Sequence, residues 1–176
     1  MLLLAAIPLL VLQQAPDPDV DWDAEFGVEA EIRDSITGEL PVEPYDRSNA
    51  NAGAAPFAGD SMAAHFNGQP GIRRVVDRLV DLNLADPRIA AIFAGHDMVR
   101  LRRTLFEQFC YILNAGCDYT GRDMRASHDG LGSRKGDMNA LVENLQAAMG
   151  EEGVPFAAQN RFLSKLAPMS GDVIER

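Results

Sequence analysis

The apolar residues of this chain recur with the period of an α-helix from about Ser61 to the C-terminus. In residues 71–87, the spacing i, i+3, i+4, i+7, i+8 of a helix buried on one face is met by Ile72, Val75, Val76, Leu79 and Val80. The pattern returns at Leu101, Leu105, Phe109 and Ile112, and again at Met138, Leu141, Val142, Leu145 and Met149. No stretch alternates between apolar and polar residues as a half-buried strand does. The sequence therefore predicts an all-α domain of about five helices over residues 61–176.

Two segments of different composition precede this domain. Residues 1–15 form an apolar run with the length of a signal-peptide core, which is too short to span a bilayer as a helix. We therefore expect export to the periplasm and no stable membrane span. The alternative is a cytoplasmic protein whose N-terminal helix packs on the domain, since no basic residue precedes the run. Residues 16–60 are acidic and rich in Pro, Gly and Ala, which predicts a flexible linker.

The net negative charge of the chain comes entirely from its N-terminal third. The formal net charge is −10, and the first 60 residues hold twelve acidic side chains against only Arg33 and Arg47. The remaining residues balance fourteen acidic with fourteen basic side chains. Neither part has the basic stripe that binds phosphates, so nucleic acid is excluded as a partner.

The motifs for metal, phosphate and nucleophile chemistry are missing, and the only histidines are His65, His96 and His128, far apart in the sequence. A zinc site needs three or four protein ligands, which makes zinc a poor fit. A haem iron needs only one, because the porphyrin supplies four nitrogens. A single histidine is therefore sufficient for a haem site.

Two stretches resemble a known family. The stretch "LADPRIAAIFAGHDMVRLRRTLFEQF" and the stretch "YTGRDMRASHDGLG" are similar to the group I truncated haemoglobins, small two-over-two helical globins, and the resemblance covers about residues 61–176. The resemblance implies one haem b per chain, with His128 as the proximal iron ligand. It also implies that Phe93 packs on the haem face, that Phe109 contacts the haem, and that Tyr119 and Met124 form the proximal wall.

The distal side departs from this family. Where many members have a tyrosine and a glutamine that hydrogen-bond oxygen, this chain has Val80 and Leu105, and Leu101 occupies the position of a distal histidine. None of the three can donate a hydrogen bond. His96 could reach a propionate or the iron, but we expect it to be exposed, and we expect Arg100, Arg102 and Arg103 to form a solvated helix face.

The resemblance and the apolar distal side together favour a protein that binds oxygen, nitric oxide or carbon monoxide at a five-coordinate iron. Two alternatives stay open: a haem enzyme, such as a nitric oxide dioxygenase or peroxidase with a reductase partner, and a globin-fold interaction module without haem. A gas-binding protein is favoured over an enzyme because no distal acid or base is present.

The chain has two cysteines, Cys110 near the end of a predicted helix and Cys117 in the turn that follows. Their close spacing predicts a disulfide in an exported protein. The alternative is a pair of reduced thiols in a cytoplasmic globin.

Overall fold

The computed structural model describes residues 32–176, and within this range the chain forms helices and connecting segments but no strand. The helices in chain order are η1 (Asn49–Ala52), α2 (Ser61–His65), α3 (Gly68–Ala85), α4 (Ala90–Phe93), α5 (Met98–Ile112), α6 (Met124–His128), α7 (Lys135–Glu151), α8 (Phe156–Leu166), η2 (Ala167–Met169) and α9 (Ser170–Val173). The all-α prediction is therefore confirmed. No helix of this range is long and apolar enough to cross a membrane, and the predicted signal-like residues 1–15 lie outside it.

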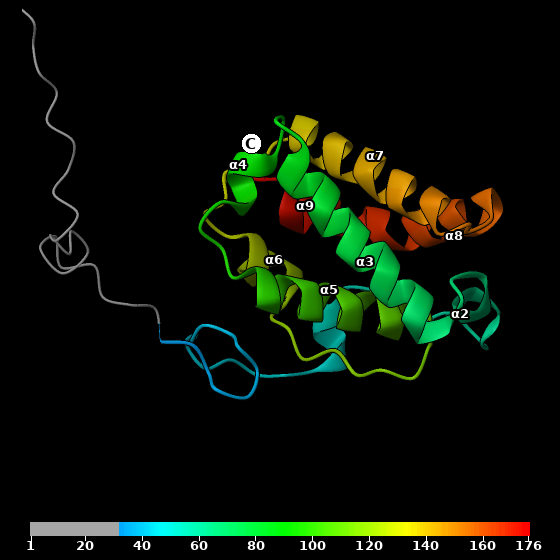
Figure 1. The fold of residues 1–176 in the computed structure, drawn as a ribbon, viewed down its shortest axis with the longest axis horizontal. Helices are drawn as coiled ribbons and strands as arrows, with labels where there is room; N and C mark the ends of the chain where they lie inside the picture. The colour runs from blue at the N-terminus through cyan, green and yellow to red at the C-terminus, as the bar shows by residue number, and fades with distance from the viewer. Residues whose placement is uncertain (1–31) are drawn as a thin grey trace, which may run out of the picture. The chain divides into compact units, whose positions relative to one another are not determined.

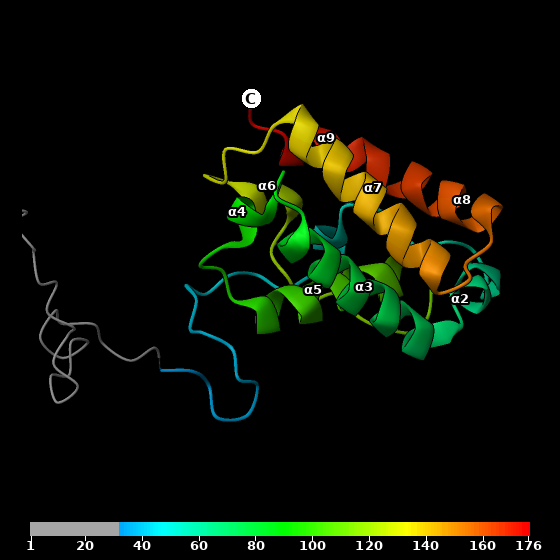
Figure 2. The same ribbon diagram turned by 45° about the horizontal axis from the view of Figure 1, so that its top comes forward.

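Helix α3 is the centre of the helical arrangement. It lies between α5 and α7 and packs on both, while α8 runs beside α7 (Figure 1 and Figure 2). The apolar stripe predicted from the sequence is the buried face of α3, where Ile72, Val75, Val76, Leu79 and Val80 are at most 1% exposed. The pairs α3 with α5 and α7 with α8 form the two layers of a two-over-two arrangement.

Asp97 is the N-cap of helix α5. Its carboxylate accepts hydrogen bonds from the backbone amides of Val99, at 3.1 Å, and Arg100, at 3.4 Å. Three buried rings then join this helix to its neighbours. The ring of Phe162 on α8 packs edge-on against Phe109, at 4.9 Å between centroids, and against Phe66, at 5.3 Å.

The segment before α2 differs from its prediction. We predicted a flexible linker over residues 16–60, and residues 16–31 lie outside the described range, but residues 33–58 pack against the helices. We call these residues the N-terminal strap. Glu39 is only 6% exposed and Ala52 is fully buried, and η1 contacts α5. The compact unit therefore begins at Arg33 rather than at residue 61.

Polar contacts hold the strap in place. Its Glu39 forms ion pairs with Arg100, at 3.2 Å, and with Arg103, both on α5. The backbone amide of Leu40 donates to the Asp97 carboxylate at 2.8 Å, and the Tyr45 hydroxyl donates to the carbonyl of Thr120 at 3.0 Å. Composition suggested a linker because acidic and small residues have little apolar surface to bury. The strap is nevertheless held, because its polar groups bind specific partners on the helices.

Candidate functional site

His128 is the last residue of α6, a helix of only five residues. The carboxylate of Asp123 caps this helix by accepting a hydrogen bond from the amide of Ala126 at 2.8 Å. Met124, at the first turn, is buried at 9% exposure, and His128 follows four residues later on the same side of the helix. The imidazole of His128 is half-buried, so it is partly shielded from water but not sealed in the core.

One hydrogen bond fixes the orientation and the tautomer of this imidazole. Nδ1 of His128 lies 2.6 Å from the backbone carbonyl oxygen of Met124. A carbonyl oxygen only accepts, so the bond requires the proton on Nδ1 and leaves Nε2 of the neutral ring as a free lone pair. No hydrogen bond or ion pair within residues 32–176 engages Nε2. This is the arrangement in which a histidine ligates a metal, with its other ring nitrogen held by a carbonyl.

The four residues expected to line the distal side, together with the expected haem contact Phe109, fall into two groups. Phe93, Leu101 and Leu105 are half-buried, as side chains beside a ligand site would be without the ligand. Val80 is fully buried, and Phe109 is 4% exposed and packed on Phe162. In this structure Val80 and Phe109 therefore belong to the packed interior, and the accessible apolar surface comes from the other three.

Tyr119 is buried in the connection between α5 and α6. Its hydroxyl donates to the carbonyl of Arg122 at 2.8 Å, and its amide donates to the side-chain oxygen of Asn49 in the strap at 2.7 Å. Burial raises the pKa of Tyr119, since the phenolate is the poorly solvated form. Tyr119 is thus a neutral, donating residue at any physiological pH.

Sequence reasoning missed Gln108. This side chain is 6% exposed and its amide nitrogen donates to the carbonyl of Ala52 in the strap at 2.9 Å. The same nitrogen lies 3.1 Å from the sulfur of Met124 and 3.7 Å from the sulfur of Met169. The sequence did contain a signal: Gln108 lies one turn after Leu105 on the face of α5 that carries the apolar stripe.

The arginines of α5 are another difference from the prediction. We expected a solvated face, but Arg100 and Arg103 close over the buried Glu39, and Arg102 pairs with Asp77 at 3.3 Å and with Asp81 at 2.5 Å. The hydrogen bond to Glu39 raises the pKa of Arg103 above its ordinary value. His96, in contrast, is exposed as expected.

The two cysteines lie together. Cys110 and Cys117 have Cα atoms 5.6 Å apart and sulfur atoms at bonding distance, and Cys110 is fully buried. Their positions connect the last turn of α5 to the segment that leads to Tyr119.

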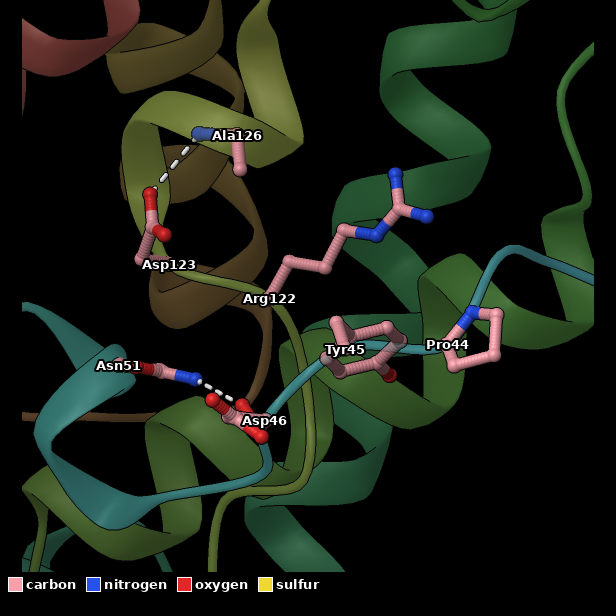
Figure 3. Close-up of a pocket in the computed structure, with 7 residues that line it drawn as sticks. All are labelled: Pro44, Tyr45, Asp46, Asn51, Arg122, Asp123 and Ala126. Carbon is pink, nitrogen blue, oxygen red and sulfur yellow. Dashed lines mark hydrogen bonds between the residues drawn. The ribbon is translucent and has the colours of Figure 1, made fainter.

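Two clefts border the strap. One, of about 500 Å³, is lined by Tyr45, Asn51, Arg122 and neighbouring residues, with the Arg122 guanidinium 5.2 Å from the centre of the Tyr45 ring (Figure 3). The second, of about 490 Å³, lies against Glu39 and three arginines of α3 and α5. Neither is lined by His128. Among the described residues no group of three or more His, Cys, Asp or Glu side chains could hold a metal ion by itself.

Comparisons with known proteins agree with this architecture. A family model described as bacterial-like globin matches residues 64–175. The group 1 truncated haemoglobin GlbN of Nostoc commune is 30% identical over 112 residues, which cover 64% of this chain and 95% of that protein. The corresponding protein of Mycolicibacterium paratuberculosis is 26% identical over 113 residues, covering 64% and 83%.

Solved structures show the same fold. Truncated haemoglobin from Tetrahymena pyriformis in its Fe(III) form aligns with a TM-score of 0.63 and 23% identity, covering 65% of this chain and 98% of that one. A two-over-two haemoglobin from a Synechococcus species, solved in the cyanomet state with covalently attached haem, aligns with a TM-score of 0.60 and 21% identity, covering 65% and 98%. The match of the family model over most of the chain, together with the helical arrangement, shows that this chain belongs to the bacterial-like globin family and is a group I truncated globin.

Proposed function

We propose that this chain would hold one haem b through His128, and that the bound haem would take up a diatomic gas. The observation that carries the proposal is the 2.6 Å contact between Nδ1 of His128 and the Met124 carbonyl, which prepares Nε2 as a ligand. Family membership supports haem as the cofactor. Bound haem supplies an iron with one coordination position for a gas molecule, and the chain supplies the ligand, the pocket and the exclusion of water.

The chemistry of the distal side supports a pocket with low preference for oxygen. Leu101 and Leu105 are half-buried on α5, and neither can donate a hydrogen bond. Oxygen gains charge when it binds and is stabilised by a donor, whereas carbon monoxide depends on a donor much less. The loss of one such hydrogen bond in a dry site lowers affinity by roughly tenfold to a hundredfold.

The same residues favour gas binding over an enzyme. A peroxidase needs a distal base and a polar group beside the peroxide. Gln108 is the polar side chain on this face of α5, and its amide is held by the Ala52 carbonyl and lies against Met124. A dioxygenase needs oxygen to persist in the pocket, which an apolar lining disfavours.

Replacing His128 with Gly tests the proposal. The full chain, reconstituted with haem, should lose its ferrous carbonyl spectrum on this change and regain it with added imidazole, which fills the vacated position. His65→Gly is the matched control, because His65 is exposed at the end of α2, and its spectrum should equal that of the unmodified chain. An unchanged spectrum for His128→Gly, or no haem binding by the unmodified chain, would overturn the assignment and favour the haem-less interaction module.

The distal part of the proposal is tested by Leu105→Gln. Oxygen should dissociate from this variant about tenfold to a hundredfold more slowly than from the unmodified protein. Leu105 is a better site for the change than Val80, which is fully buried and would be overpacked by a larger side chain. Carbon monoxide binding is the steric control and should change little. Equal oxygen release in both proteins would show that Leu105 does not face the gas.

A further inference from the structure

We infer that the N-terminal strap positions His128, and that Gly53 and Gln108 are the positioning residues through which it acts. The inference rests on the proposed function, because it treats His128 as the proximal ligand. It goes beyond the family resemblance, since the family match begins at residue 64 and leaves the strap out. Three contacts support it. The strap approaches Met124 closely at Gly53, Gln108 contacts both the strap and Met124, and the strap hydrogen-bonds to the segment that leads into α6.

Gly53 brings the backbone of the strap against the wall that carries His128. A Cβ atom at this position would lie 2.2 Å from the sulfur of Met169 and 3.0 Å from Cγ of Met124. The residue also has a φ of +79°, in the left-handed region that favours glycine. Only glycine therefore lets the strap sit this close to Met124.

Gln108 connects the strap to the same methionine. Its amide nitrogen donates to the carbonyl of Ala52, next to Gly53, and lies against the sulfur of Met124. With the strap in place Gln108 is 6% exposed, so the strap both covers this amide and supplies its carbonyl partner. The buried amide thus makes the position of Met124 depend on the presence of the strap.

The strap also clamps the segment between α5 and α6. The side chain of Asn49 accepts from the amide of Tyr119 and donates to the carboxylate of Asp118 at 2.9 Å. Further along the strap, Asn51 donates to the carbonyl of Gly121 at 3.2 Å. These contacts hold Asp118, Tyr119 and Gly121, in the segment that leads to the cap of α6 at Asp123.

The short length of α6 makes these contacts decisive. A helix of five residues has little stability of its own, so its position is set by what it touches. Its first residue, Met124, is held by Gly53 and Gln108, and the carbonyl of that same residue accepts the hydrogen bond from Nδ1 of His128. Displacing the strap therefore releases Met124 and, with it, the orientation and tautomer of the imidazole.

The experiment compares Gly53→Ala with Gly59→Ala in the full chain. Gly59 also has a positive φ, of +68°, but a Cβ there meets nothing within 4 Å, so the pair separates the contact with Met124 from backbone strain. Gln108→Leu is the second variant, which keeps the size of the side chain and removes its donor. Should Gly53→Ala fail to fold, Gln108→Leu carries the test.

Two readouts report the imidazole itself rather than general stability. In the haem-free protein, 15N NMR of the His128 ring gives the fraction with the proton on Nδ1, which should fall in Gly53→Ala and Gln108→Leu and stay unchanged in Gly59→Ala. In the haem-loaded ferrous protein, the iron–histidine stretching band should shift or broaden in the same two variants. Haem should also dissociate about threefold to tenfold faster from them, the effect of one lost hydrogen bond.

The outcomes separate this inference from the proposed function. If Gly53→Ala and Gln108→Leu lower the melting temperature but leave both the ring tautomer and the stretching band as in Gly59→Ala, the strap is only a structural support and the inference is wrong. If the unmodified chain binds no haem while the tautomer responds as expected, the proposed function fails and the coupling of the strap to His128 stands.

Discussion

Helix α8 and the N-terminal strap both bury residues against the globin helices, but they use opposite chemistry to do so. Phe162 of α8 is fully buried between two aromatic rings, and that contact needs only complementary shape. Glu39 of the strap is nearly as well buried because two arginines of α5 meet its carboxylate. Apolar packing can therefore be predicted from the periodicity of one segment, whereas polar docking depends on partners that lie far away in the sequence.

The largest expected effect is on the apolar packing of α8. Phe162→Ala removes a fully buried ring and leaves a cavity, so the free energy of unfolding should fall by about 3–5 kcal/mol. Phe156→Ala on the same helix is the control, because Phe156 is 70% exposed, and its effect should stay within about 0.5 kcal/mol. Urea denaturation of both variants makes the measurement. Similar losses for the two would mean that α8 does not pack as described.

The second effect concerns Cys110 and Cys117, which join the apolar helix α5 to the segment on which the strap docks. We predict that the two form a disulfide in an exported protein. With seven residues of sequence separation, reduction should lower the free energy of unfolding by ~2.5 kcal/mol on the chain-entropy account. Denaturation with and without reductant measures this difference.

The same prediction can be tested in the compartment where the protein resides. Intact mass after alkylation, on protein recovered from its own cells, should show no free thiol. Two alkylated cysteines would argue against both the bridge and the export proposed from residues 1–15.

The smallest expected effect is the pH dependence of the polar contacts between Asp97 and the strap. Burial alone would raise the pKa of Asp97, but hydrogen bonds from the Leu40 amide, from Arg33 and from the first amides of α5 outweigh it and hold this pKa below its ordinary value. Because the folded pKa is lowered, the stabilisation is complete above about pH 4 and is lost as the pH falls through the folded value.

Asp97→Asn isolates this effect, since asparagine still caps a helix but carries no charge. Limited proteolysis of the strap between about pH 3 and pH 5 should show acid-induced release in the unmodified chain and a flatter profile in Asp97→Asn. Asp60→Asn is the control, because the side chain of Asp60 makes no capping hydrogen bond. Identical profiles for Asp97→Asn and the unmodified chain would remove Asp97 from the forces that hold the strap.

The sequence predicted the helical part of the fold well, because the apolar period of each long helix lies within one segment. The periodic positions predicted in residues 71–87 are the buried face of α3. The predicted stripe of α3 is wholly buried, whereas in α7 Leu145 and Met149 are buried and the other three positions are half-buried. Haem as the cofactor followed from the resemblance and agrees with the family found by comparison. The roles of His128, Phe93, Leu101 and Leu105 stay predictions, although their burial is compatible with them.

The strap could not be predicted in the same way. Its residues have no period, and the arginines that hold Glu39 lie more than sixty positions further along the chain. Local composition describes what a segment can bury by itself, and it carries no information on which distant side chain will pair with it. Gln108 of α5 was the one signal of the strap in the sequence. A polar residue on the apolar stripe of a helix indicates that this face contacts a polar partner there.

The close approach at Gly53 also constrains how this chain can change over generations. A side chain at position 53 would collide with Met169, so we expect glycine there to persist wherever a bulky residue occupies position 169. A lineage that lost the strap would remove Glu39 from Arg100 and Arg103, and the Ala52 carbonyl from Gln108. Those three positions should then drift together toward smaller or apolar residues, and such joint replacement would identify descendants that have lost the strap.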